Sequence, residues 1–214
     1  MTQPQHPESL DTLQAIRSLM ERSSRFISLS GLSGVSAGIC ALIGATVAGV
    51  YLGRFDGQEL NYDNFYELER WGMKVNIFMF LDAGLVLVFA VLSAIYFTTR
   101  KAKQKGLKVW DAVTRRLVLS LAVPLLAGGV FILALLYHGI IGLVAPCTLL
   151  FYGLGLVNAS KYTLDDVRQL GYAQIVLGLL TCFNVGYGLE SWALGFGVLH
   201  IAYGFYMYYK YERS

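Results

Sequence analysis

The chain of 214 residues is 56% hydrophobic and 14% charged, whereas soluble globular domains carry about 25% charged residues. Its formal net charge is only +3, so no overall field favours nucleic acid, and we expect no nucleic-acid partner. Its three cysteines, Cys40, Cys147 and Cys182, all lie in apolar runs without a CxxC pair, which argues against a disulfide framework and a thiol redox site.

Long apolar runs alternate with short polar ones, which is typical of multi-span membrane proteins. In chain order the apolar segments are about 27–52, 75–97, 117–138, 140–159, 170–188 and 192–209. Each is long enough for a transmembrane helix, and none shows the alternation of a barrel strand. We therefore predict an all-α polytopic membrane protein with six transmembrane helices. Residues 26–209 would form the transmembrane domain, between an N-terminal segment (1–25) and a tail (210–214).

The distribution of basic residues predicts the orientation. With the N-terminus inside, every Lys and Arg except Arg54, Arg70 and Lys74 lies in an inner segment. Cytoplasmic loops carry an excess of such residues, so the prediction is N-in and C-in. The basic run Arg100–Arg116 is first a topology signal and second a candidate contact for anionic lipid headgroups.

The N-terminal segment contains a helical pattern. Leu10, Leu13, Ile16 and Met20 recur at helical spacing, with arginines on or near the opposite side. This pattern predicts a short amphipathic helix on the inner membrane surface. Docking of a partner protein is the alternative interpretation.

The stretch SGLSGVSAGICALIGATVAG (30–49) is rich in small residues. A phosphate-binding loop requires a strand before it and a helix after it, whereas this stretch lies within one continuous apolar segment. Small residues let transmembrane helices approach closely. The predicted packing residues are Gly34, Gly38, Ala41, Ala45, Gly197 and Gly204. The packing partner is either another span or another subunit.

Two connections carry further signals. The first outer loop, GRFDGQELNYDNFYELERWG, is acidic and aromatic, and we expect a short interfacial helix there. The sequence Thr163-Leu164-Asp165-Asp166 is typical of a helix start with a capping residue and acids in the first turn.

Ionisable residues inside a bilayer are costly, so they are the first candidates for a functional site. Asp82 in the second span and His200 in the sixth lie at similar distances from the predicted outer ends of their spans. Asn184, Cys147 and Thr148 reach a similar depth by the same count. The sequence thus predicts one polar level in the outer half of the membrane.

Three interpretations of this level remain open. Asp82 and His200 could line a polar cavity that exchanges a proton or binds a cation or small solute. They could hold a soft metal together with Cys147 or Cys182, but no metal-binding spacing is present, so we expect no metal and no cofactor. They could also form only structural hydrogen bonds between helices.

The preferred function is transport of a small solute, ion or proton, or membrane sensing, through the level of Asp82 and His200. The alternative is a non-catalytic scaffold or accessory subunit, as a homo-oligomer or with a membrane partner. A lipid-acting enzyme is the third candidate, but the chain has no HExxH motif. We therefore expect no enzymatic activity.

Two stretches, FISLSGLSGVSAGICALIGA (26–45) and LLFYGLGLVNASKYTLDDVRQLGYAQI (149–175), resemble an uncharacterised family of six-span inner-membrane proteins of Bacteroidota-type bacteria. The resemblance implies a bacterial inner (cytoplasmic) membrane location. It implies no activity and no catalytic residues.

Overall fold

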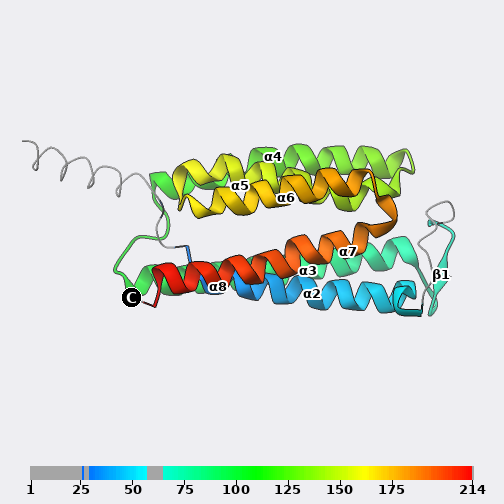
Figure 1. Ribbon diagram of the computed structural model, residues 1–214, viewed down its shortest axis with the longest axis horizontal. Helices are drawn as coiled ribbons and strands as arrows, with labels where there is room; N and C mark the ends of the chain where they lie inside the picture. The colour runs from blue at the N-terminus through cyan, green and yellow to red at the C-terminus, as the bar shows by residue number, and fades with distance from the viewer. Residues whose placement is uncertain (1–25, 27–28, 57–64, 214) are drawn as a thin grey trace, which may run out of the picture.

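The helices of the computed structural model form two layers (Figure 1). One layer contains α2 (Gly31–Leu52), α3 (Val75–Gln104) and a last helix made of α7 (Gly188–Trp192), the π-helical segment η5 (Ala193–Leu199) and α8 (His200–Tyr211). The other layer contains α4 (Ala112–Tyr137), α5 (Val144–Ala159) and α6 (Asp166–Cys182). The structure describes residues 26, 29–56 and 65–213, so the predicted amphipathic helix lies outside the described residues.

Four helical stretches are long and apolar enough to cross a membrane: Gly31–Leu52, Val75–Gln104, Ala112–Tyr137 and Ile141–Tyr162. They confirm the helical, multi-span class and correspond to the first four predicted spans. The last two predicted spans correspond to α6 and to the last helix, which run along the same two layers (Figure 1). The 17 residues of α6 rise about 26 Å, close to the thickness of a hydrocarbon core.

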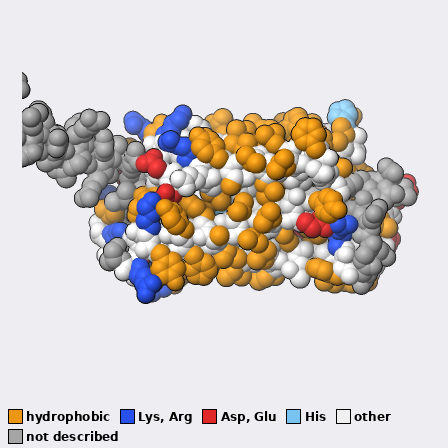
Figure 2. Space-filling view, viewed as in Figure 1, with side chains coloured by type: hydrophobic (Ala, Val, Ile, Leu, Met, Phe, Trp, Pro, Cys, Tyr) orange, Lys and Arg blue, Asp and Glu red, His pale blue; other side chains and the backbone are white. Residues whose placement is uncertain are grey.

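The outer surface of the bundle is apolar where a bilayer would cover it. In the most apolar stretch of α3 none of the residues is buried, and in α4 almost none is. Figure 2 shows the hydrophobic side chains as a broad band, with Lys and Arg mostly at the end that carries the C-terminus. Apolar faces of this size are what lipid-exposed helices require.

The small-residue face of α2 packs against the last helix. A methyl group added to Gly38 would lie 2.7 Å from the carbonyl oxygen of Gly197, and one added to Gly204 would lie 2.6 Å from that of Gly31. Both distances are too short for any side chain, so these glycines let the two backbones touch. This face therefore has its partner within the chain.

Helices α5 and α6 approach each other in the same way. A methyl group on Gly153 would lie 2.7 Å from the carbonyl oxygen of Gly171, and one on Gly178 would lie 2.9 Å from that of Pro146. The sequence prediction did not include these three glycines, although they also stand in apolar helices.

The described parts of the first outer loop are a short 3-10 helix, η1 (Arg54–Asp56), and a hairpin, while residues 57–64 of the predicted interfacial helix lie outside the described residues. Strand β1 (Glu69–Arg70) pairs antiparallel with β2 (Met73–Lys74). The two residues between them, Trp71 and Gly72, have φ values of 49° and 74°, and positive values at both positions favour a tight hairpin turn. The Tyr51 hydroxyl anchors the hairpin: its oxygen lies 2.9 Å from the Arg70 carbonyl oxygen and 2.7 Å from that of Met73, and its one hydrogen is shared between them.

Helix α6 begins at Asp166, later than the predicted cap at Thr163. The Thr163 hydroxyl donates to the Phe26 carbonyl at 2.9 Å, and the Phe26 N–H donates to the Tyr162 carbonyl at 2.7 Å. The threonine therefore ties the chain before α2 to the α5–α6 connection, and its hydroxyl is not used to cap α6.

Residues Lys210, Tyr211 and Glu212, here termed the C-terminal clamp, join the two layers at one end. Lys210 Nζ and the Tyr211 hydroxyl donate to the Asp166 carboxylate of α6 at 2.8 and 2.7 Å. This hydrogen bond with Asp166 raises the pKa of Lys210. Glu212 accepts from the Gly31 N–H at the start of α2, at 2.5 Å, and from Lys101 of α3, at 3.2 Å.

Candidate functional site

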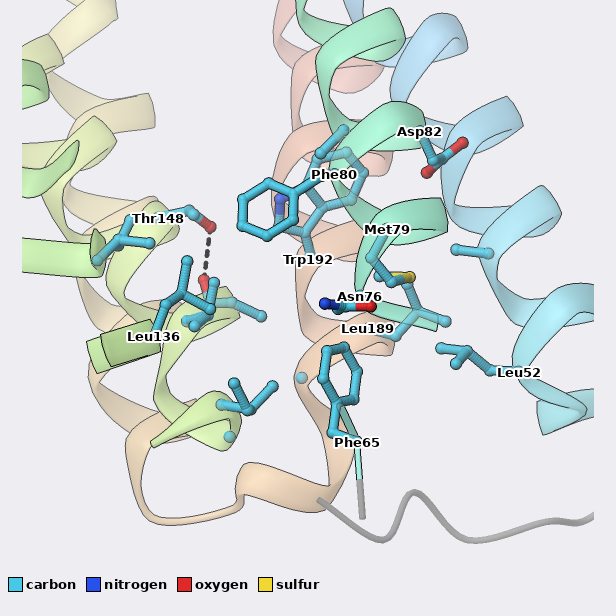
Figure 3. A pocket seen from close by; sticks show the side chains of 18 of the residues that line it. Leu52, Phe65, Asn76, Met79, Phe80, Asp82, Leu136, Thr148, Leu189 and Trp192 are labelled. Atoms are coloured by element: carbon cyan, nitrogen blue, oxygen red, sulfur yellow. Dashed lines mark hydrogen bonds between the residues drawn. The ribbon is translucent and has the colours of Figure 1, made fainter. Parts of the chain in front are cut away.

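A cavity of about 300 Å³ lies between the two layers, at the end opposite the C-terminal clamp (Figure 3). Its walls come from α2, from α3, from the end of α4, from the start of α5 and from α7, with Phe65 of the outer loop beside them. Small-molecule sites in proteins commonly have volumes of about 300–1,000 Å³. The cavity is thus large enough for a small solute.

The cavity wall is apolar except at a few side chains. Asn76 and Asp82 of α3, Thr148 of α5 and Trp192 of α7 contribute its polar atoms. The Thr148 hydroxyl donates to the Ala145 carbonyl at 2.6 Å, so its hydrogen is already used. Asn76 Oδ1 is buried and accepts no hydrogen bond from the described part of the chain. Two acceptor groups, Asn76 Oδ1 and the Asp82 carboxylate, therefore stand in this mostly apolar space, together with the donor N–H groups of Asn76 and Trp192.

Asp82 points towards α2 at the edge of the cavity (Figure 3). A methyl group on Gly44 would lie 3.4 and 3.6 Å from the two carboxylate oxygens. The same methyl group would overlap the Val86 side chain, so Val86 and the carboxylate together fill the space beside Gly44. A half-buried Asp on a lipid-facing helix is costly, and such residues usually mark a functional site.

The cavity opens at its side. Phe80 lines it and is 58% exposed, whereas Phe65 at the outer end is only 9% exposed. The Tyr66 hydroxyl donates to the Leu136 carbonyl at 2.7 Å and joins the outer loop to the end of α4. The open side is therefore the gap between α3 and α4, which faces lipid when the helices span a membrane.

His200 belongs to a second polar cluster, in which His200 and Gln174 are buried and Tyr152 is half-buried. Its Nδ1 lies 2.9 Å from the Gly195 carbonyl oxygen and its Nε2 lies 2.8 Å from the Tyr152 hydroxyl. Because a carbonyl oxygen can only accept, Nδ1 carries the proton and Nε2 accepts from Tyr152. The Gln174 side chain, 0% exposed, donates to the same Gly195 carbonyl at 2.8 Å.

The π-helical segment explains why the Gly195 carbonyl is available. A π-turn shifts the helical hydrogen bonds by one residue, and such turns are frequent at functional sites. Here the carbonyl of Gly195 accepts from two buried side chains, one of them on α6. The segment therefore joins the layers by polar contacts inside the bundle.

Asp82 and His200 do not share one level of the bundle. On α2, a methyl group on Gly34 would lie 3.3 Å from the His200 carbonyl oxygen, whereas Gly44 lies beside Asp82. Ten residues of helix rise about 15 Å. The predicted depth of His200 was counted from residue 192 as the outer end of the last span. The last helix begins at Gly188, so His200 lies further from the outer end than predicted.

The remaining predicted residues separate in the same way. Thr148 lines the cavity. Asn184 is exposed in the turn after α6 and donates to the Leu180 carbonyl at 3.1 Å. Cys147 is buried next to Thr148 and is not among the residues that line the cavity. Within the described part of the chain no three His, Cys, Asp or Glu side chains are grouped closely enough to hold a metal ion.

Sequence reasoning missed Asn76, Tyr152 and Trp192. Asn76 is a polar residue in the first turn of a long apolar helix, a signal that was available in the sequence. Tyr152 and Trp192 resemble ordinary residues of an apolar span, and only the structure places them beside His200 and the cavity.

Comparisons with known proteins add no relative to this description. No family model matches the chain, and neither the curated proteins nor the solved structures gave a match. The resemblance to six-span bacterial inner-membrane proteins therefore stays a prediction.

Proposed function

We propose that this protein is a six-span inner-membrane protein, with both termini inside, that binds a small solute in the cavity between its two helix layers and thereby transports or senses it. The observation that carries the proposal is the cavity of about 300 Å³ with two acceptor groups and an open side. Concave, mostly apolar sites with a few placed polar groups are the usual form of small-molecule sites.

In the described part of the bundle, aromatic rings lie between the cavity and the buried cluster around His200. The ring of Phe196 lies 5.0 Å from that of Trp192, 5.0 Å from that of Tyr152 and 5.8 Å from that of His200. A solute entering from the side would therefore stop above Phe196. In this account the conformation is open towards the outer half of the bilayer and closed towards the inside.

The two-layer architecture supports a movement that would open the other side. Transporters commonly rock one helix bundle against another around a central site. Here the layers are joined by a small number of polar contacts, among them Tyr152 with His200 and Lys210 with Asp166. The alternative of a scaffold that dimerises through its glycine faces has less support, because these faces pack within the chain.

Binding is testable through Trp192, which lines the cavity. The variant Trp71→Phe/Trp110→Phe leaves Trp192 as the one tryptophan of the chain. In nanodiscs of zwitterionic lipid, its fluorescence is followed with three quenchers that share one chain, namely ω-bromo-octylamine, ω-bromo-octanol and ω-bromo-octanoate. We expect saturable quenching by at least one of them.

Two substitutions on α3 separate the cavity from the bilayer. Ala83 lines the cavity, whereas a side chain at the adjacent Gly84 would meet no atom within 4 Å. Ala83→Phe should abolish saturable quenching, while Gly84→Phe should leave it unchanged. If none of the three quenchers saturates, or if both substitutions act alike, the proposed function is wrong.

A further inference from the structure

Two acceptors of the cavity, Asn76 Oδ1 and the Asp82 carboxylate, have no partner in the described part of the chain, which bears on the solute of the proposed function. Asn76 Oδ1 is buried without a donor. Asp82 forms no hydrogen bond or ion pair with the described part of the chain, and a carboxylate needs donors or a positive charge when it leaves water. None of the described cavity-lining residues is Lys, Arg or His. A ligand that complements this cavity therefore brings both the donors and the positive charge.

The apolar part of the cavity determines the rest of the ligand. Phe65, Phe80 and Trp192 present aromatic rings, and Leu136 of α4 lies across the cavity from Phe80 and Trp192 (Figure 3). Ile132 of α4 also lines the cavity. Aromatic faces attract cations, and aliphatic walls bury hydrocarbon. A fully hydrated inorganic ion would leave these walls without a partner.

The side opening determines the route. Phe80 is exposed on the lipid-facing surface of α3 and lines the cavity at the same time. The outer end is narrowed by Phe65 and by the hydrogen bond from Tyr66 to the Leu136 carbonyl. A molecule dissolved in the outer leaflet thus reaches the cavity between α3 and α4 without crossing the outer loop.

We infer that the cavity takes a cationic amphiphile, an alkylammonium with hydrogen-bond donors on its nitrogen, from the outer leaflet. This inference rests on the proposed function. The ammonium binds at the Asp82 carboxylate, and the hydrocarbon lies in the apolar part of the cavity.

The test compares the three ω-bromo quenchers of Trp192 on the same protein. Their chains are alike and their head groups are cationic, neutral and anionic at neutral pH, so the difference between them isolates the head group. The concentration of each compound in the bilayer is calculated from its partition into protein-free nanodiscs, and the affinities are compared on that scale. We expect the amine to saturate at a concentration at least about tenfold below that of the alcohol, which corresponds to a difference of about 1.4 kcal/mol.

Variants then assign the preference to named atoms. Asp82→Asn should bring the amine to the affinity of the alcohol and leave alcohol binding unchanged, whereas Gly84→Ala should change neither. Equal affinity for amine and alcohol in the unmodified cavity, or preference for the carboxylate, would overturn the inference while the proposed function stands. Absence of saturable binding by all three compounds would overturn both. The comparison of head groups needs no variant at Asp82, so it holds even if Asp82→Asn fails to fold.

Discussion

The Tyr152 hydroxyl and His200 Nε2 lie 2.8 Å apart and join α5 of one layer to the last helix of the other. His200 is 6% exposed, and its second nitrogen donates to the Gly195 carbonyl. Both ring nitrogens are therefore satisfied inside the bundle. The pair holds the layers together below the cavity.

Removing this hydroxyl should destabilise the protein without closing the cavity. Tyr152→Phe leaves Nε2 of His200 buried without a donor, which costs about 1–3 kcal/mol. We expect that loss in the free energy of unfolding, measured by denaturant titration in mixed micelles. Tyr137→Phe is the control, because Tyr137 is 87% exposed and exposed substitutions change stability by about 0.5 kcal/mol or less. Equal stability of the two variants would contradict the assigned contact.

The same glycine-to-alanine substitution should destabilise the protein at Gly38 but not at Gly129, because the surroundings of the two glycines differ. Gly38→Ala places a methyl group 2.7 Å from the Gly197 carbonyl oxygen, and such overpacking costs about 1–3 kcal/mol. Gly129→Ala on α4 meets nothing within 4 Å and should be neutral or stabilising, because alanine favours helix over glycine. The check is the unfolding midpoint of each variant under the same conditions. Similar midpoints would show that α2 does not touch the last helix.

Close packing of small residues was predictable in kind from the sequence, but its partner was not. Spacing alone marks Gly34 and Gly38 as a packing face, whereas the choice of the last helix as partner depends on which layer each helix joins. Gly153 and Gly171 also stand in apolar helices, where small residues indicate close packing, but the sequence prediction did not include them. The membrane class followed from composition and apolar length, which depend only on the chain itself.

The C-terminal clamp should behave as a coupled unit. Glu212 accepts from the buried Lys101 and from the first N–H of α2. Glu212→Ala leaves the Lys101 charge without its carboxylate partner. The substitution should therefore lower the free energy of unfolding more in the protein that has Lys101 than in the Lys101→Met variant. A double-mutant cycle on unfolding free energy should give a coupling of about 0.5–3 kcal/mol. Additive effects would show that the pair contributes nothing.

The start of α4 should make stability depend on pH. Asp111 accepts from the Thr114 N–H at 2.7 Å and from its hydroxyl at 2.9 Å, and the bond from this N–H holds the pKa of Asp111 below its usual value. A carboxyl group whose pKa is lowered on folding stabilises the fold fully at pH values above its unfolded-state pKa. This stabilisation is lost as the pH falls through the folded-state pKa.

The substitution Asp111→Ala should therefore cost about 1 kcal/mol at neutral pH and progressively less below about pH 4. Asp111→Asn keeps an acceptor without a titrating group. The difference in unfolding free energy between Asp111→Asn and Asp111→Ala should therefore be the same at every pH tested. Unfolding free energies measured at pH 7, 5 and 3 check both variants. A cost for Asp111→Ala that does not change with pH would contradict the assignment.

The candidate site was predictable only in part, for a geometric reason. Asp82 stands out because a charge in an apolar helix is rare. The predicted pairing of Asp82 with His200 depended on counting residues from the ends of two spans. That count was wrong because the last helix begins several residues before its apolar segment. Trp192 and Asn76 lie at the ends of apolar segments, where a polar or amphipathic side chain is ordinary, so only the arrangement of the layers shows that they share a cavity with Asp82.

The central claim, that the cavity opens to the bilayer between α3 and α4, is tested most directly by quenching with lipids. The protein with Trp192 as its one tryptophan is placed in nanodiscs whose phosphatidylcholine carries bromine on the acyl chains. The account predicts that Trp192 is quenched, that Ala83→Phe relieves the quenching and that Gly84→Phe does not. Trp192 fluorescence that is the same in brominated and ordinary lipid, or that responds equally to both substitutions, would contradict it.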